Sequence, residues 1–411
     1  MAIPQPADER CQRIAHWLEH QALPLWHTVG LCPDTGGFHE TLTMTGDPVP
    51  DALRRVRVQF RQMYAFAHAH ALGLTTRGLE AARQGFEFVW EHAWAPDGQP
   101  GWAHTLYPDG SLADGKRDTY DHAFAVFGLA WYFSVSRDTR ALFAIGETLR
   151  YLEERLRAGN GGWIEDDSAL PKAVQRRQNP HMHAFEASMA LFELTGDASA
   201  IETVSEQLSL FKAHFYNPAQ RVVLEFFDQD WSPIATPNLQ RVEPGHLVEW
   251  VWLLREYERL FGLDLEEVVD PHANALFNRA HEIGLAPGGI FIVDELHMDG
   301  SAAKQTRRFW PQTELLKAYL SQYRASGDIR YRRQAEALID ALFDSYLSDC
   351  APGGWRDVFT LDGEAATDVM PASTFYHIFN AFAQALTVLA PADAPRPQTI
   401  GPRQNAYPLT A

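Results

Sequence analysis

A short glycine turn followed by an apolar or aromatic residue recurs along the chain and constrains the fold more than any other feature. The turns are Gly36-Gly37-Phe38, Gly101-Trp102, Gly161-Gly162-Trp163, Gly288-Gly289-Ile290-Phe291 and Gly353-Gly354-Trp355. Their spacing is about 61 to 65 residues, apart from one double interval of about 127 residues. A sixth turn is expected inside that interval, near residues 217–231, where Val222–Phe227 has a strand-like pattern but no glycine. The chain is therefore predicted to contain six repeated units.

Each unit is predicted to carry two helices, because apolar residues between the turns recur at three and four positions. Short polar turns, such as residues 136–138 and 195–197, alternate with connections of about 20 to 30 residues that contain the glycine turns. Connections of that length are usually functional. The predicted helices cover residues 7–23, 51–73, 75–94, 118–136, 138–158, 180–195, 197–215, 244–261, 265–284, 307–325, 327–347 and 371–388.

The helices that follow the long connections are rich in aromatic and small residues, whereas their partners carry more charge. This difference is expected of inner and outer helices. We therefore predict an all-α fold, an (α/α)6 barrel of six helical hairpins with short β-hairpin-like loops at one mouth. An open solenoid is the main rival, but about 34 residues per helix is twice the length that a tetratricopeptide helix takes. Residues 1–389 are predicted to form one domain, and residues 390–411 a proline-rich tail.

The charge balance limits the kinds of partner. The chain has 35 Lys and Arg against 53 Asp and Glu, a net charge of −18, so its field repels nucleic acids and anionic membranes. The sequence has no run of about 18 apolar residues and begins with a polar segment, so we expect a cytoplasmic protein that does not bind a membrane. Three cysteines without paired spacing predict neither disulfides nor a zinc site. A homodimer through the outer helices is compatible with this pattern.

Polar residues recur where each inner helix begins. They are Arg61; Tyr120, Asp121 and His122; Asn179, His183 and Glu186; His246 and Glu249; Trp310 and Glu314; and His377. Any one of them has an ordinary explanation, and His122 in particular is expected to be a hydrogen-bonded core residue. Together they imply a shared polar cavity, because unpaired buried charge is costly.

No metal or cofactor is predicted. The His181/His183 and His68/His70 pairs lie two residues apart, so on a helix they point about 200° apart and cannot bind one ion. Phosphate-binding loops, dinucleotide motifs and a nucleophilic serine elbow are absent from the sequence. We interpret Glu249, one turn after His246, as a residue that orients or charges this imidazole.

Several motifs in order resemble one family. Arg61-Gln62, Pro244-Gly245-His246-x-x-Glu249, Arg308-Phe309-Trp310-Pro311-Gln312-x-Glu314 and Phe375-Tyr376-His377 together resemble the N-acylglucosamine 2-epimerase superfamily of (α/α)6-barrel sugar epimerases and isomerases. Tyr120-Asp121-His122-Ala123-Phe124 and Asn179-x3-His183-x2-Glu186 are most similar to its mannose and sulfoquinovose aldose–ketose isomerases. Gln312 stands where the acylglucosamine epimerases carry histidine, which argues against an N-acyl sugar.

The resemblance implies a small-molecule sugar substrate and His246 and His377 as the acid/base pair. It implies a sugar site formed by Arg61, Tyr120, Asn179, His183, Glu186, Glu249, Trp310 and Glu314. The implied reaction is a metal-independent interconversion of an aldose and a ketose, of the D-mannose/D-fructose type, through a cis-enediol.

The position of His246 at a helix N-terminus predicts a neutral imidazole. We favour His377 as the proton shuttle and His246 as the acid or the ring-opening group. Three alternatives stay open: a 2-epimerase acting on mannose, N-acylglucosamine or cellobiose, a glycoside hydrolase using the carboxylates of Asp121, Glu186, Glu249 and Glu314, and a binding scaffold without catalysis.

Overall fold

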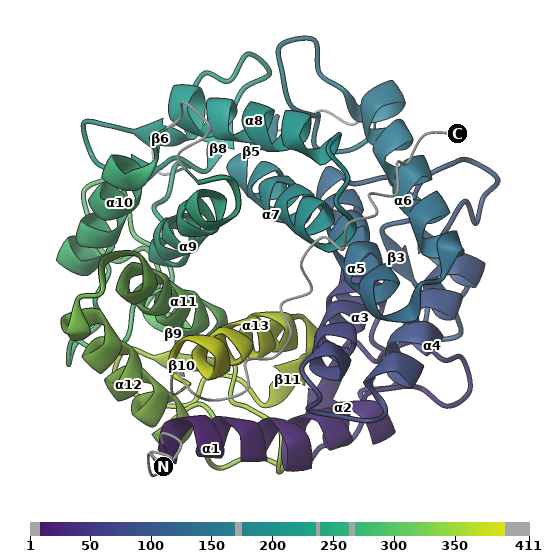
Figure 1. The fold of residues 1–411 in the computed structure, drawn as a ribbon, viewed down its shortest axis with the longest axis horizontal. Helices are drawn as coiled ribbons and strands as arrows, with labels where there is room; N and C mark the ends of the chain where they lie inside the picture. Colours follow the sequence, from purple (N-terminus) through teal and green to yellow (C-terminus); the bar gives the residue numbers. More distant parts are fainter. Residues whose placement is uncertain (1–8, 169–174, 236–238, 263–267, 391–411) are drawn as a thin grey trace, which may run out of the picture.

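The computed structural model describes residues 9–168, 175–235, 239–262 and 268–390, and it is mostly helical, as predicted. Except for residue 390, the predicted proline-rich tail lies outside the described residues. Six of the described helices form a closed inner ring in which each contacts the next and the last returns to the first (Figure 1). They are α3 (Val56–Ala71), α5 (Thr119–Ser136), α7 (Gln178–Thr195), α9 (Pro244–Phe261), α11 (Phe309–Ser326) and α13 (Ala372–Val388).

A second layer of helices surrounds this ring, each packed on an inner helix of its own unit or of the neighbouring one. These outer helices are α1 (Glu9–Trp17), α2 (Leu23–Thr28), α4 (Gly78–His92), α6 (Thr139–Tyr151), α8 (Ala200–Leu210), α10 (Asp270–Ile283) and α12 (Ile329–Asp344). Short π-helical turns at Leu18–Ala22, Leu152–Leu156 and Phe211–Phe215 follow α1, α6 and α8. The outer helices bury one face, whereas the inner helices are buried on most sides.

The predicted helix ranges agree closely with these bounds. The predicted helix 51–73 begins at Val56 instead, because Arg54–Arg55 form a strand. The predicted helix 7–23 continues to Thr28, because the π-helical turn Leu18–Ala22 leads directly into α2. Within the described residues, no helix combines the length and the apolar composition that a bilayer span requires.

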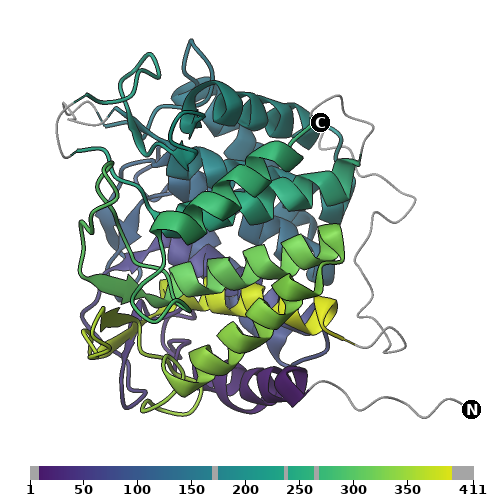
Figure 2. The ribbon, with the colours of Figure 1, turned by 90° about the vertical axis from the view of Figure 1, so that its left-hand side faces the viewer.

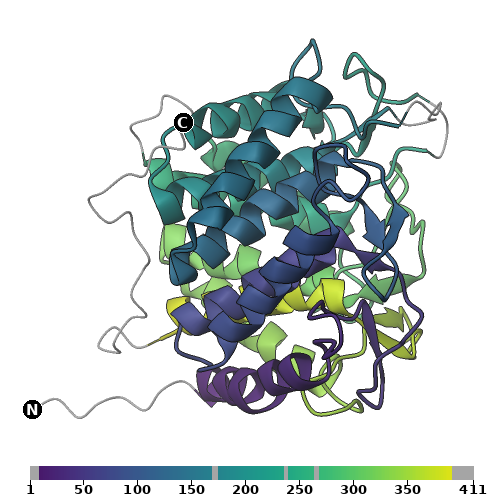
Figure 3. The same ribbon diagram turned by 90° about the vertical axis from the view of Figure 1, so that its right-hand side faces the viewer.

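Short antiparallel strands gather at one end of the molecule, on the left in Figure 2 and on the right in Figure 3. The strand pairs are β1 (Thr41–Thr43) with β11 (Val369–Pro371), β2 (Arg54–Arg55) with β3 (Thr105–Leu106), β3 with β4 (Leu112–Asp114), β5 (Arg176–Arg177) with β8 (Phe226–Phe227), β6 (Tyr216–Asn217) with β7 (Val222–Val223), and β9 (Thr306–Arg308) with β10 (Val358–Thr360). Several pairs join loops of different units rather than forming hairpins. In particular, Thr41 pairs with Pro371, which links the first unit to the last.

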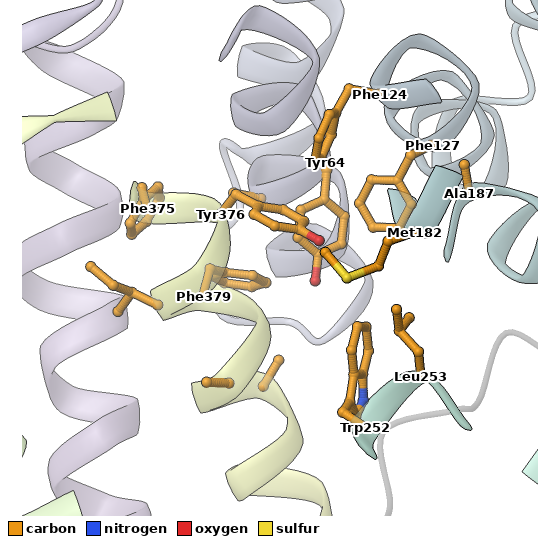
Figure 4. Close-up of a cluster of buried hydrophobic side chains, with 14 of the residues drawn as sticks. Tyr64, Phe124, Phe127, Met182, Ala187, Trp252, Leu253, Phe375, Tyr376 and Phe379 are labelled. Carbon is orange, nitrogen blue, oxygen red and sulfur yellow. The ribbon is translucent and has the colours of Figure 1, made fainter. Parts of the chain in front are cut away.

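Aromatic side chains fill the centre of the inner ring (Figure 4). The ring of Tyr64 lies 4.7 Å from that of Phe127 and 5.5 Å from that of Tyr376, and Phe124 lies 5.3 Å from Tyr376. Such offset and edge contacts stabilise a core beyond simple burial. This layer forms a rigid floor beneath the ends of the helices where the loops gather.

One contact is repeated at the start of every inner helix. A polar side chain near each turn bonds to the beginning of the inner helix that follows. In four units it stands two residues after the aromatic residue of the turn, in one it stands three residues after Phe291, and in one it lies in the strand-like segment Val222–Phe227. These side chains are Glu40, His104, Glu165, Glu225, Asp294 and Asp357, and they bond to Arg55, Asp121, Arg177, His246, Arg308 and Thr374, respectively.

In three units the contact is the same in detail. Glu40, Glu165 and Asp294 each accept a hydrogen bond from the backbone N–H of an arginine that precedes the helix, at 2.9, 2.8 and 2.7 Å. The guanidinium of that arginine adds an ion pair with the same carboxylate. The loops are thereby attached to the inner ring at the mouth.

The turn glycines are needed where they approach an inner helix. Gly162 has a φ of +64°, and a Cβ at this position would lie 2.5 Å from Nε2 of His181. That nitrogen accepts a hydrogen bond from the backbone N–H of Trp163 at 3.0 Å. Burial lowers the pKa of His181 to about 4, so the ring is neutral and can accept. His122 accepts from the N–H of Trp102 in the same way, as predicted for a hydrogen-bonded core histidine.

We expect Gly162→Ala to destabilise the protein by roughly 2–4 kcal/mol, because it combines a left-handed backbone with the loss of the His181 hydrogen bond. The control is Gly159→Ala in the same loop, where an added Cβ meets nothing within 4 Å. Urea unfolding followed by circular dichroism measures both. Equal free energies of unfolding for the two variants would contradict this account.

Candidate active site

A cavity of about 280 Å³ lies at the mouth, where the inner helices begin. Every inner helix of the described ring supplies at least one side chain to its wall. Eight of the predicted site residues line it, namely Arg61, Tyr120, Asn179, His183, His246, Glu249, Trp310 and His377. Residues distant in the sequence are thus brought together as predicted.

Glu186 and Glu314, in contrast, do not line the cavity, so their contact with a sugar stays a prediction. Each lies three or four residues further along its helix than a lining residue, which places it one turn, about 5.4 Å, deeper. There the two carboxylates bind lining histidines: Glu186 lies 2.9 Å from Nδ1 of His183, and Glu314 lies 2.7 Å from Nδ1 of His377. They orient the imidazoles from below.

The two predicted acid/base residues meet across one indole. The ring centroid of His246 lies 5.3 Å from that of Trp310, and the ring of His377 lies 5.4 Å from it on α13. Both histidines line the same small cavity. A single hexose-sized ligand packed on Trp310 is therefore within reach of both imidazoles.

The charge state of His246 differs from the prediction. Burial favours the neutral ring, but the carboxylates of Glu225 and Glu243, with a smaller effect of Glu249, outweigh it and raise the pKa of His246 to about 10. Glu225 Oε1 lies 2.9 Å from Nδ1 of His246. The expectation of a neutral imidazole at the helix N-terminus is therefore wrong, and His246 is an imidazolium at neutral pH.

The partner of His246 also differs from the prediction. Glu225 makes the direct contact, whereas Glu249 has its Oε1 3.9 Å from Nε2 of His183. Glu249 therefore contributes charge to His246 without orienting it. Burial, with the neighbouring carboxylate of Glu314, raises the pKa of Glu249 well above its ordinary value.

His377 has the opposite character. Burial, followed by the positive charges of Arg61 and Lys317, lowers its pKa well below the ordinary value. Its Nδ1 lies against Glu314, so Nε2 is the nitrogen left for a ligand. The cavity thus contains one neutral and one charged imidazole, which is the arrangement that a base and an acid require.

Arg61 and Asn179 present polar groups to the same cavity. Arg61 donates to the hydroxyl of Tyr120 at 2.7 Å and lies 4.1 Å over the ring of Phe124. Among the described residues it has no carboxylate partner, unlike the arginines at the helix starts. Oδ1 of Asn179 is buried without a hydrogen-bond partner in the described part of the chain. Both groups can bind sugar hydroxyls.

Several groups of histidine and carboxylate atoms lie within 4.8 Å of one another, a spacing that a metal ion could use. In the groups at the cavity these atoms already bind each other, as His246 binds Glu225 and His377 binds Glu314. Away from the cavity, Asp121 is bound by Arg57 and His104. Not every member is satisfied in this way, because Oε1 of Glu249 has no hydrogen-bond partner within the described residues. We assign no metal to these groups.

Sequence reasoning missed Glu225, Glu243 and Lys317. Glu225 lies in the segment Val222–Phe227, the unit that has lost its glycines, and it is the one charged residue of that segment. Lys317 is likewise a charge between Leu316 and Ala318 on an inner helix. A charge inside an apolar segment was the available signal for both.

Comparisons with known proteins agree with this geometry. The model of the N-acylglucosamine 2-epimerase (GlcNAc 2-epimerase) family matches residues 36–381. The mannose-6-phosphate isomerase of Rhizobium meliloti (strain 1021) is 36% identical over 377 residues, which cover 89% of this chain and 94% of the relative. The D-mannose isomerase of Thermobifida fusca is 26% identical, with 95% and 98% covered. The structure of cellobiose 2-epimerase from Spirochaeta thermophila DSM 6192 has a TM-score of 0.83 at 25% identity, covering 93% of this chain and 96% of that one.

Replacing Glu225 by glutamine should lower the pKa of His246 by roughly one to three units, because the nearest negative charge is removed. NMR titration of histidine side chains, with His246→Asn to assign the signal, measures this shift. Glu295→Gln is the control, since Glu295 pairs with Lys304 and not with His246. A His246 pKa that stays near 10 in Glu225→Gln would show that other groups hold its charge.

Proposed function

The chain belongs to the N-acylglucosamine 2-epimerase family, and from this premise we propose that it is a sugar isomerase on an (α/α)6 barrel that interconverts an aldose and a ketose of the D-mannose/D-fructose type. One observation carries the proposal. A neutral imidazole, His377, and a charged imidazole, His246, flank Trp310 in one small cavity. Isomerisation through an enediol needs a base that removes a proton from carbon and an acid that protonates oxygen, both within reach of one sugar.

The residues divide the chemistry between them. Nε2 of His377 takes the proton from C2 of the open-chain aldose and returns it to C1 of the cis-enediol. In ring opening, the imidazolium of His246 gives a proton to the ring oxygen and takes back the proton of the C1 hydroxyl. It then protonates the C1 carbonyl oxygen as the enediol forms, and it takes the O2 proton as the C2 carbonyl forms, so that it ends the reaction as the imidazolium. Arg61, which has no carboxylate partner among the described residues, stabilises the enediolate oxygen. Trp310 packs on the C–H face of the sugar.

The cavity favours a neutral monosaccharide. Its volume of about 280 Å³ lies just below the roughly 300–1,000 Å³ of pockets that hold drug-sized ligands. The arginines Arg55, Arg177 and Arg308 around the mouth are bound by carboxylates, and Glu243 and Asp357 add acidic groups to the wall. A phosphate or sulfonate at C6 would find these cations already paired. The relative named mannose-6-phosphate isomerase therefore supports the type of reaction, and the electrostatics favour the unphosphorylated sugar.

A 2-epimerase is the alternative that the relatives named cellobiose 2-epimerase bring forward. It would return the proton to C2 on the opposite face of the sugar, so the product distinguishes it from an isomerase. A glycoside hydrolase is disfavoured, because only Glu249 of the four carboxylates expected for it lines the cavity. Glu186 and Glu314 lie beneath the cavity, and Asp121 is bound by Arg57 and His104.

We also propose that the reaction needs no divalent ion, because Arg61 and the imidazolium of His246 supply positive charge where oxygen charge develops. Incubation with D-mannose, and separately with D-fructose, should give interconversion of the two sugars by NMR. Prior treatment with EDTA should change the initial rate by less than about twofold. Glucose formed from mannose would overturn the isomerase in favour of the epimerase, and a rate lost with EDTA and restored by a divalent ion would overturn the metal-free mechanism.

The proton shuttle is tested by His377→Asn, which should lower kcat by roughly 10²–10⁴-fold because the base is lost. In deuterium oxide, the variant should not exchange the C2 proton of mannose, whereas the wild type should. His20→Asn, on the exposed surface of the outer layer, is the control for a lost imidazole. Substantial C2 exchange by a folded His377→Asn protein would assign the shuttle elsewhere.

A further inference from the structure

Lys317 carries a charge completely buried inside the inner ring. Its side chain is 0% exposed, one helical turn beyond Glu314 on α11. Nζ lies 2.7 Å from Oε2 of Glu314 and 3.5 Å from the ring centroid of Trp252. Burying an ammonium costs several kcal/mol unless it is paired, so a residue of this kind needs a compensating role.

The carboxylate of Glu314 links this lysine to the site. Oε2 of Glu314 faces Lys317, whereas Oε1 lies 2.7 Å from Nδ1 of His377. The contact with Lys317 is an ion pair without the alignment of a hydrogen bond. The carboxylate of Glu314 thus contacts the ammonium of Lys317 with one oxygen and the imidazole of His377 with the other.

The surroundings make this cation necessary. Three carboxylates are buried close together: Glu249 lines the cavity, and Glu186 and Glu314 lie beneath it. Burial raises the pKa of Glu314 to about 7, and the charge of Lys317 opposes the rise. A protonated Glu314 would donate to Nδ1 of His377 instead of accepting from it. The ring would then carry its proton on Nε2, with no lone pair toward the sugar.

We propose that Lys317 is a positioning residue that keeps Glu314 as a carboxylate accepting the Nδ1–H of His377, so that Nε2 of His377 faces the sugar unprotonated. Its catalytic consequence rests on the proposed isomerase function. The charged and titratable groups around Glu314 are Arg61 and Tyr64 on α3, His183 and Glu186 on α7, His246 and Glu249 on α9, Lys317 on α11, and Tyr376 and His377 on α13.

The test is Lys317→Met, which keeps the length of the side chain and removes its charge. We expect kcat to fall by about 10- to 100-fold, with KM changed by less than threefold, because Lys317 does not line the cavity. The acidic limb of the pH profile of kcat/KM should move to higher pH by roughly one to three units. The limb moves to higher pH because loss of the cation raises the pKa of both Glu314 and His377, and both groups must be deprotonated for activity.

Two further variants separate positioning from packing. Ser321→Ala, a buried change one turn further along α11, should leave both kcat and the acidic limb as in the wild type. In a Glu314→Gln background there is no carboxylate left to hold, so adding Lys317→Met should lower kcat by less than threefold. That double variant removes both charges of the pair and keeps the test valid if Lys317→Met alone does not fold. If Lys317→Met lowers kcat in the Glu314→Gln background by as much as it does in the wild type, the proposal is overturned.

NMR of ¹⁵N-histidine-labelled protein tests the positioning without turnover, with His377→Asn to assign the signal. At a pH about one unit above the pKa of Glu314, His377 should carry its proton on Nδ1 in the wild type and shift toward the Nε2–H form in Lys317→Met. A folded Lys317→Met protein with the wild-type tautomer or the wild-type acidic limb would overturn the role of Lys317. A wild-type protein that converts no sugar would instead refute the proposed function, and the tautomer would still decide the role of Lys317.

Discussion

Charge can be buried inside a ring of helices only when it is paired, and the candidate site is built from such pairs. Glu225 binds His246, Glu186 binds His183, and Glu314 lies between His377 and Lys317. Each pair satisfies groups that would otherwise be costly to bury. The pKa values of the two imidazoles beside Trp310 move in opposite directions: burial, with the charges of Arg61 and Lys317, lowers that of His377, whereas Glu225 and Glu243 raise that of His246.

Paired polar side chains also attach the loops to the inner ring. In every unit, a polar side chain from the long connection binds the start of the following inner helix, and in three units the partner is an arginine. In the unit that has lost its glycines, the corresponding residue is Glu225 and its partner is His246. The contact that raises the pKa of His246 is therefore a variant of the contact that attaches the loops to the inner ring.

The helices could be predicted because apolar periodicity is a local property, and the cavity because all six inner helices begin at one mouth. Depth could not be predicted: periodicity places Glu186 and Glu314 on the correct helix face, one turn below the lining residues. The predicted neutral state of His246 was wrong because the effect of the helix terminus is smaller than that of a neighbouring carboxylate. A helix terminus contributes roughly 0.3–1 kcal/mol, whereas a carboxylate at 2.9 Å shifts a pKa by roughly one to three units. Glu225 reaches His246 through a loop whose path local patterns do not reveal.

The pairing of β1 with β11, together with the contact of α13 with α3, has a consequence for the history of such a chain. An open array of repeats can lengthen or shorten by one copy, because each copy touches only its neighbours. Here the last copy is also a neighbour of the first, so losing or gaining one would break the circle and leave two uncovered faces. Variation is then confined to the loops and to the side chains that face the centre, where this chain carries its chemistry.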